Sequence, residues 1–202
     1  LLAFPGHKGL LGPPGTGALY VGERVDLDSL REGGTGSHSE LEMQPTELPF
    51  KLECGTVNSA GIAGLGAGLK YIFKEGTERI LAYEQSLTDR LIKGLARILR
   101  VTVYRDKDGT RQTPVVSLTI EEAEPMEVGA ILDQAFDTKV RTGLHCAPAA
   151  HKTIGTFPRG TVRLSPGYFN TTKEIDVTIK AIEKIARSGI ILKAVEETAL
   201  SD

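Results

Sequence analysis

The sequence has little of what several protein classes require. Its 202 residues include two cysteines, no tryptophan and no Cys-x-x-Cys motif. The two cysteines, Cys54 and Cys146, stand far apart, which argues against a disulfide framework or a structural zinc site. No apolar run approaches the roughly 18 residues of a membrane helix. The formal net charge of -2 provides no basic footprint for nucleic acid. We therefore expect a cytoplasmic protein with no metal, membrane or nucleic-acid partner.

The residue patterns that are present predict an α/β protein. A hydrophobic share of 40% is enough for a core, and the length suits one large or two small domains. Apolar spacing and turn signals predict helices at 58–74, 77 to about 99, 125–136 and 172–187, and strands at 1–4, 18–21, 101–104, 115–120, 139–141 and 161–164. The pattern changes around the long helix, which predicts two domains, 1–76 and 77–202, the second starting with that helix as a linker.

A lysine near the start of the chain is the first candidate for chemistry. Lys8 follows His7 and the apolar run 1–4, and it precedes a turn rich in glycine and proline. A lysine at the end of a short strand can hold its amine against a cofactor and form a Schiff base. The alternative is a solvated surface lysine at a turn. The glycine-rich segment 12–17 is not a nucleotide-binding loop, because Ala18 and Leu19 follow it where Lys and Ser or Thr are needed.

A cysteine far downstream is the second candidate. Cys146 has Arg141, His145 and His151 as neighbours in sequence, and such cationic or protonatable groups favour the nucleophilic thiolate. The alternative is a buried apolar cysteine, the commoner fate of a lone cysteine. Cys54 has no basic company, and we expect no reactivity from it.

Two further segments have the residues to bind an anion. Arg163 lies inside a short apolar strand, where a guanidinium needs a structural carboxylate or a ligand. Gly55, Thr56 and Asn58 precede a predicted helix, whose first N–H groups could hold a phosphate. An ordinary helix cap is the alternative for that segment, and on its own it is the better reading.

Six motifs in order resemble one family. The chain contains Gly-His-Lys, Gly-Pro-x-Gly-x-Gly, Gly-Thr-x-Asn, Arg-x-Gly-x-His-Cys, Val-Arg-x-Ser and Phe-Asn-Thr. Together they resemble the class V aminotransferases, and most of all the branch of cysteine desulfurases and selenocysteine lyases. The resemblance runs from about residue 3 to 188. It implies the type I fold of transferases that depend on pyridoxal 5'-phosphate (PLP), here the end of the large domain plus the small C-terminal α/β domain.

The resemblance implies a cofactor site. Lys8 matches the lysine that binds PLP covalently, and His7 matches the histidine beside the PLP phosphate. Gly55 and Thr56 match residues that reach the phosphate of the partner subunit, which implies a homodimer. Pro5 stands where many relatives have a Ser or Thr that bonds the phosphate, so that contact is lost here.

The resemblance also implies roles toward the substrate. Cys146 matches the catalytic cysteine that takes sulfur as a persulfide. Arg163 matches the arginine that holds the substrate carboxylate. Arg141 matches a family arginine near the active cysteine, and Asn58 of the Gly-Thr-x-Asn motif is assigned to substrate binding with them.

The implied reaction converts L-cysteine to L-alanine and an enzyme persulfide, with a sulfur-acceptor protein as a further partner. Two alternatives stay open. One is an aminotransferase or another lyase of the same fold, in which Cys146 is incidental. The other is a dimerisation or interaction domain without catalysis. Because the first residue is Leu1 and the family's residues before the lysine have no counterpart, we expect a C-terminal portion that is inactive alone.

Overall fold

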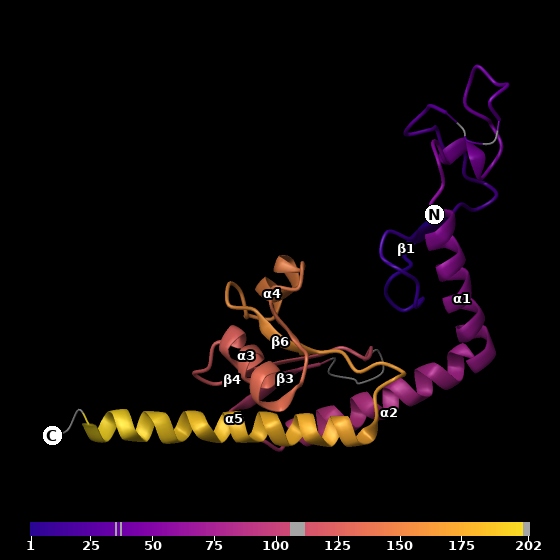
Figure 1. Cartoon of the computed structure of the whole chain (residues 1–202). Coiled ribbons are helices and arrows are strands. Elements are labelled where there is room, and N and C mark those ends of the chain that lie inside the picture. The colour runs from indigo at the N-terminus through magenta and orange to yellow at the C-terminus, as the bar shows by residue number, and fades with distance from the viewer. Residues whose placement is uncertain (35, 37, 106–111, 200–202) are drawn as a thin grey trace. The chain divides into compact units, whose positions relative to one another are not determined.

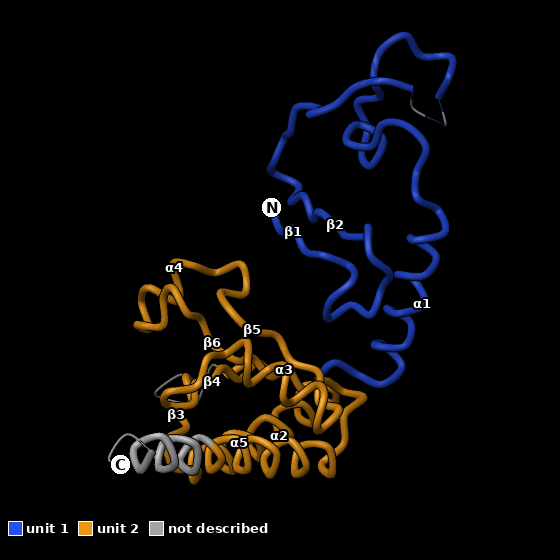
Figure 2. The backbone as a smooth tube through the Cα atoms, turned by 60° about the vertical axis from the view of Figure 1, so that its left-hand side comes forward, with its two compact units in different colours: residues 1–77 blue, residues 78–202 orange. Residues whose placement is uncertain are grey.

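The structure is a computed structural model that describes residues 1–34, 36, 38–105 and 112–199, without side chains from 189 onward. The chain divides into two compact units, Leu1–Thr77 and Glu78–Asp202 (Figure 2). Each unit is described by itself below. The predicted site residues are distributed over both.

The first unit consists of a hairpin, an irregular segment and one helix. Strand β1 (Leu2–Pro5) pairs antiparallel with β2 (Gly17–Tyr20), and Pro5 lies opposite Gly17. The irregular segment contains a single turn of 3-10 helix, η1 (Phe50–Leu52). Helix α1 (Ser59–Glu75) follows. All residues of both strands are exposed, so the hairpin contributes no buried core.

Glycines of α1 allow the hairpin turn to pack closely on the helix. A side chain at Gly64 would meet Pro13 at 3.1 Å, and one at Gly68 would meet the carbonyl oxygen of Leu10 at 2.5 Å. Glycine costs a helix roughly 1 kcal/mol relative to alanine. The close contact with the turn gives these two positions a packing reason for that cost.

The second unit is a four-stranded antiparallel sheet with helices (Figure 1). Its strands are β3 (Val101–Tyr104), β4 (Val116–Ile120), β5 (Arg141–Gly143) and β6 (Thr161–Leu164). Its helices are α2 (Thr77–Leu95), α3 (Pro125–Phe136), α4 (Pro148–Thr153) and α5 (Thr172–Ala199). The strand order is β3-β4-β6-β5, so the two strands that carry the predicted site residues are neighbours.

One face of this sheet is the core. Residues of β4 alternate between buried and half-buried, the period of two expected when one face is covered. The buried face packs against α2, α3 and α5. The core residues with at most 1% exposure are Leu87, Leu91, Leu95, Val116, Leu118, Val128, Leu132, Val162, Ala181 and Ile182.

The other face is polar and carries the two predicted arginines. Arg163 of β6 lies between Ser117 of β4 and Arg141 of β5 in register. Residues directly opposite in an antiparallel pair project to the same side. The two arginines therefore share one face of the sheet.

The structure corrects several predicted boundaries. The strand predicted at 139–141 is instead β5, which starts at Arg141. Segment 137–140 leaves α3 through the left-handed Asp137, and the amine of Lys139 pairs with Asp137 at 3.0 Å. Helix α2 ends at Leu95 and not near 99. There the chain tightens into short turns and then reverses at Arg100, whose φ is 68°. The short helices α4 and η1 were not predicted.

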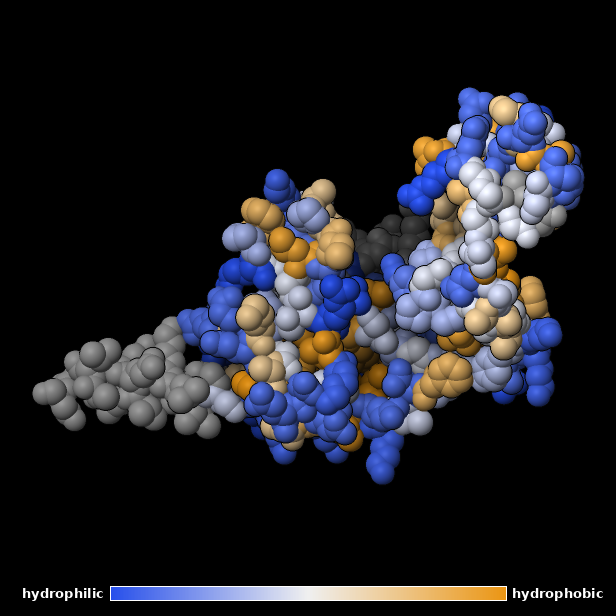
Figure 3. Space-filling model, turned by 45° about the horizontal axis from the view of Figure 1, so that its top comes forward, coloured by the Kyte–Doolittle hydropathy of each residue, from blue (hydrophilic) through white to orange (hydrophobic). Residues whose placement is uncertain are grey.

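Exposed apolar side chains interrupt an otherwise hydrophilic surface on the face shown in Figure 3. In the described part of the chain, no helix has the length and apolar character needed to cross a membrane.

Candidate active site

Hydrogen bonds hold the backbone around Lys8, whereas the Lys8 side chain is exposed to solvent. Gly6 is buried and donates its N–H to the carbonyl of Thr16 at 2.8 Å, and its own carbonyl accepts from Gly12 at 2.8 Å. The carbonyl of Lys8 accepts from Leu11 at 3.0 Å. The side chains of His7 and Lys8 are exposed. Among the described residues the Lys8 amine has no hydrogen-bond or ion-pair partner, so it is available to a ligand.

The segment before α1 forms a helix cap. Asn58 accepts the N–H of Gly61 at 3.0 Å through Oδ1, which satisfies one free donor of the first turn. Gly55 has a φ of 80° and donates its N–H to the carbonyl of Gly34 at 2.6 Å. Thr56 is exposed. Asn58 therefore caps α1, and the N–H of Gly55 is already engaged by Gly34.

Cys146 lies at the tip of a tight turn between β5 and α4. The turn is closed by a hydrogen bond of 2.8 Å from Ala147 N–H to the Leu144 carbonyl. Two successive residues have left-handed backbones, His145 with φ 52° and Cys146 with φ 60°. Residues other than glycine adopt this conformation at a cost and often at functional sites. The Cys146 thiol is free and exposed, so the buried-cysteine alternative is wrong.

Two glycines make room for this turn. A side chain at Gly160 would overlap the Gly143 carbonyl group. Gly160 and Gly143 have φ values of 79° and 95°, and residues other than glycine rarely adopt such angles. The close approach of the two backbones fixes where β5 ends and the Cys146 turn begins.

The surroundings of His145 disfavour its charged form. A hydrogen bond of 3.1 Å joins its Nε2 to the hydroxyl of Thr161, a fully buried residue of β6. Burial is the main cause that lowers the pKa of His145 below the ordinary 6.5. The positive charge of Arg163 lowers this pKa further, as do His151 and Arg141, while the Thr161 carbonyl acts in the opposite direction. Arg141, Arg163 and His151 thus gather around His145, the residue that precedes Cys146.

The paired arginines lack a counterion within the described residues. Arg163 is half-buried, and its Nε is inaccessible to water and makes no hydrogen bond there. Like charges directly opposite each other on neighbouring strands destabilise a sheet. An anion between Arg141 and Arg163 would remove that cost. A carboxylate matches the planar guanidinium fork.

The predicted residues fall into two groups. His7, Lys8, Gly55, Thr56 and Asn58 belong to the first unit, and Arg141, Cys146 and Arg163 to the second. Within the second unit the structure joins residues that are about twenty positions apart in sequence.

Sequence reasoning missed Thr161 as the anchor of His145. The alternation of 161–164, with Thr161 and Arg163 on the same face, was the signal that could have revealed it.

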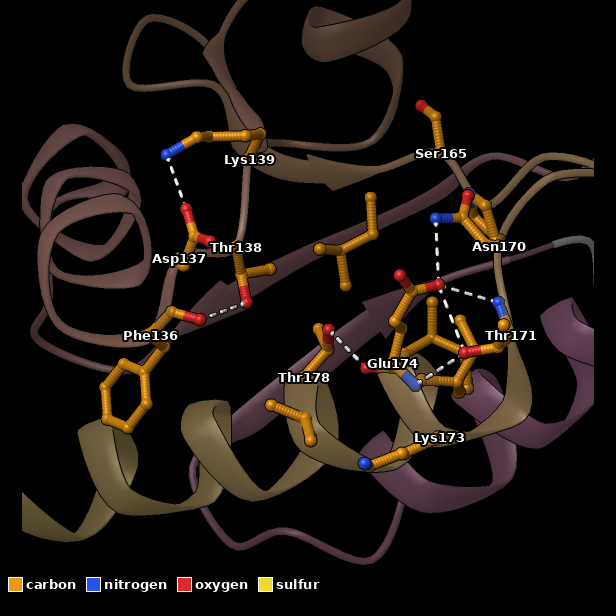
Figure 4. A pocket seen from close by; sticks show the side chains of 15 residues that line it. Phe136, Asp137, Thr138, Lys139, Ser165, Asn170, Thr171, Lys173, Glu174 and Thr178 are labelled. Atoms are coloured by element: carbon orange, nitrogen blue, oxygen red, sulfur yellow. Dashed lines mark hydrogen bonds and ion pairs between the residues drawn. The ribbon is translucent and has the colours of Figure 1, made fainter.

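A cavity of about 610 Å³ in the second unit contains none of these residues (Figure 4). Two of its polar side chains, Thr171 and Glu174, cap the start of α5. Glu174 accepts the N–H of Thr171 at 2.7 Å, and Thr171 accepts the N–H of Glu174 at 3.3 Å, a reciprocal capping box. The Phe-Asn-Thr motif thus starts a helix here, and we assign no ligand to this cavity.

The family model described as Aminotransferase class-V matches residues 1–177, and the chain belongs to this family of PLP-dependent enzymes. The chain is also 38% identical over 192 residues to a probable cysteine desulfurase of Methanothermobacter thermautotrophicus, covering 93% of this chain and 48% of that protein. A probable cysteine desulfurase of Pyrococcus abyssi is 35% identical, with 93% and 47% covered. The chain thus spans about half the length of these relatives.

Solved structures agree with this assignment. The apo cysteine desulfurase of Thermococcus onnurineus NA1 superposes with a TM-score of 0.78 at 33% identity, covering 92% of this chain and 46% of that one. A cysteine desulfurase of Escherichia coli has the same TM-score of 0.78 at 26% identity, with 92% and 45% covered. These neighbours and the mixed α/β architecture confirm the predicted fold, that of type I PLP-dependent transferases.

Proposed function

We propose that the protein containing this chain is a cysteine desulfurase that converts L-cysteine to L-alanine and a persulfide on Cys146. The observation that carries this proposal is the Cys146 turn. A free, exposed thiol at the tip of a left-handed turn suits a nucleophile better than a structural cysteine. The residue before it, His145, lies within electrostatic reach of Arg163 and Arg141. The similarity to proteins named cysteine desulfurase supports the same reading.

The residues of the hairpin turn fit the cofactor. Lys8 offers an exposed primary amine without a partner among the described residues, and it would hold PLP covalently through Nζ. His7, next to it and also exposed, would lie against the phosphate. When bound, PLP withdraws electrons from the substrate and so activates the bonds around its α-carbon.

Arg163 and Arg141 would bind and orient the substrate carboxylate. The two guanidiniums share one face of the sheet and lack a counterion among the described residues. A bound carboxylate would offset their repulsion and fix the direction of the substrate. Burial and then the charge of Arg163 lower the pKa of His145, which disfavours a third positive charge beside the two arginines.

Cys146 would carry the sulfur. Its thiolate attacks the substrate sulfur, so that a new S–S bond forms while the bond between that sulfur and the substrate β-carbon breaks. The electron pair of the broken bond stays with the substrate carbon skeleton. Protons complete the methyl group and the α-carbon of alanine, and Lys8 Nζ holds and delivers the proton at the α-carbon. No external oxidant or reductant is required.

Further parts of the proposal concern partners. A homodimer would bring Thr56 to the cofactor phosphate of the other subunit. Gly55 would join it there if its N–H left the Gly34 carbonyl and donated to the phosphate instead. Asn58 would contribute to the substrate site through its side-chain NH2 group, because its Oδ1 is used to cap α1. The exposure of Cys146 would let a sulfur-acceptor protein reach the persulfide. Both cysteines are free, which suits a reducing cytoplasm.

The test is alanine release from L-cysteine by the full-length protein loaded with PLP. We expect Cys146→Ser to lower turnover by about a hundredfold or more, because the nucleophile is lost. Cys54→Ser is the matched control and should stay within about twofold, since exposed or half-buried substitutions away from a site have small effects. Unchanged turnover in Cys146→Ser would rule out this mechanism.

A further inference from the structure

A second histidine, which the proposed mechanism does not use, lies behind the Cys146 turn. His151 of α4 is 4% exposed. Its Nδ1 lies 2.7 Å from the hydroxyl of Thr156, which is 8% exposed. Buried polar groups need such a partner, and each of these two side chains supplies it to the other. His151 and Thr156 are called the His–Thr pair below.

The His–Thr pair joins two turns through its backbone. The N–H of His151 donates to the carbonyl of Ala147, the residue after Cys146, at 3.2 Å. The carbonyl of His151 accepts from Thr156 at 2.9 Å, and the carbonyl of Thr156 accepts from Gly160 at 2.7 Å. The segment that leaves Cys146 is thereby tied to the turn that leads into β6.

The ring of His151 also supports the residue that precedes Cys146. The rings of His145 and His151 are 5.5 Å apart between centroids, inclined by 45°. On its other side His145 is bonded through Nε2 to Thr161 at 3.1 Å. The Nδ1 of His145 is buried and has no hydrogen-bond partner among the described residues. Thr161 and His151 are therefore two contacts that hold this ring.

The backbone of the turn requires such support. His145 and Cys146 are both left-handed, a conformation that persists only where the surroundings impose it. The hydrogen bond from Ala147 to Leu144 closes the turn but does not fix its side chains. The contacts of the His145 ring with Thr161 and His151 hold one of these side chains, that of His145.

We propose that His151 and Thr156 are positioning residues for the Cys146 turn, and that they set the direction in which the thiol projects during sulfur transfer. The pair acts through His145 and Ala147 and does not touch the substrate. The catalytic consequence rests on the proposed desulfurase function. The structural consequence, a turn held by this pair, does not.

Thr156→Val tests the pair with little change in volume. We expect faster amide hydrogen exchange across 144–152, by about fivefold or more, because the hydroxyl that anchors His151 is gone. In the full-length protein loaded with PLP, kcat for alanine release should fall about tenfold while the KM for cysteine stays within twofold, since Arg163 is untouched. Thr156→Ser, which keeps the hydroxyl, should restore both values.

Two further variants serve as a second test of the pair and as a control. His151→Gln moves the polar group away from the δ position, so it should show the same changes in exchange and kcat as Thr156→Val. It replaces Thr156→Val in the test if that variant fails to fold. Thr88→Val is the matched control, because Thr88 is fully buried in α2 and its hydroxyl bonds the Glu84 carbonyl at 2.8 Å. It should change neither exchange across 144–152 nor kcat.

Each outcome decides the proposal. Unchanged exchange in both Thr156→Val and His151→Gln would show that the pair does not hold the turn. Faster exchange with unchanged kcat, or with a rise in KM alone, would show that the pair holds the turn but does not position the thiol for catalysis. If the wild type releases no alanine from cysteine, the proposed desulfurase function fails, while the exchange measurements still decide whether the pair holds the turn.

Discussion

The two units of the chain differ in how much core they have. Sixteen of the eighteen buried hydrophobic residues found in the described chain belong to the second unit, and two, Leu65 and Ile72, belong to the first. The hairpin β1–β2 exposes Leu2, Leu19 and Tyr20 by 48% or more. A two-stranded hairpin is marginal in water without further strands or a hydrophobic face.

This difference separates two ways of holding a reactive group. Cys146 and Arg163 are attached to a sheet with a packed core, so their geometry follows from the stability of the second unit. Lys8 is attached to a turn that is fixed by backbone hydrogen bonds and by close packing on the glycines of α1. We infer that the geometry at Lys8 depends more on additional protein contacts than the geometry at Cys146 does.

The largest expected effect compares a leucine from each unit. Leu118 of β4 is fully buried and Leu19 of β2 is 48% exposed. We expect Leu118→Ala to lower the free energy of unfolding by about 3 kcal/mol, from lost burial plus a cavity. Leu19→Ala should lower it by less than about 0.5 kcal/mol. Denaturant unfolding of both variants, followed by circular dichroism, measures the contrast, and similar losses would contradict the division into a packed and a poorly packed unit.

A second comparison uses two glycines with the same backbone angle. Gly160 in the second unit and Gly15 in the first both have a φ of 79°. A side chain at Gly15 meets open space, whereas one at Gly160 would overlap the Gly143 carbonyl. Gly15→Ala should cost about 1 kcal/mol for the left-handed backbone alone. Gly160→Ala should cost about 2–3 kcal/mol, because the close approach of the two backbones is lost as well.

The readout for the glycine pair is the shift of the unfolding midpoint in each variant. The exchange of amides in β5 and β6 provides a local control, since only Gly160→Ala should accelerate it. Equal costs for the two substitutions would mean that the contact with Gly143 contributes nothing.

Much of the second unit could be predicted from the sequence because its signals are periodic. The ranges 101–104, 125–136 and 161–164 agree with β3, α3 and β6. The strand predicted at 139–141 lies instead at Arg141–Gly143. This strand, β5, has only three residues, and its position is set by pairing with β6 and by two glycines. Such tertiary constraints leave no local pattern in the sequence.

The site was predictable by residue type but not by arrangement. The basic neighbours of Cys146 in sequence predict a reactive thiol, and the structure brings Arg163 from β6 close to one of them, His145. That Arg141 and Arg163 face each other follows from strand register, which the sequence does not specify. The left-handed angles of His145 and Cys146 were equally hidden, since neither residue is a glycine.

The smallest expected effect concerns the pH dependence of stability in the second unit. Burial and then the charge of Arg163 lower the pKa of His145 in the folded state below 6.5, its ordinary value. The unfolded chain therefore binds a proton at this residue more readily than the folded chain does. It follows that stability is lost as the pH falls from about 7.5 through 6.5 toward the lower folded value, and His145→Asn should reduce that loss.

The midpoint temperature at pH 7.5 and at pH 5.5 is compared within each variant, so that the cost of removing the ring itself cancels. We expect the loss between the two pH values to be about 1–2 °C smaller in His145→Asn, a modest effect because solvent screens a partly exposed ring. Arg163→Gln should change the loss in the same direction, because it removes a charge that disfavours the imidazolium. A larger loss in either variant would mean that His145 is not held neutral beside the arginines.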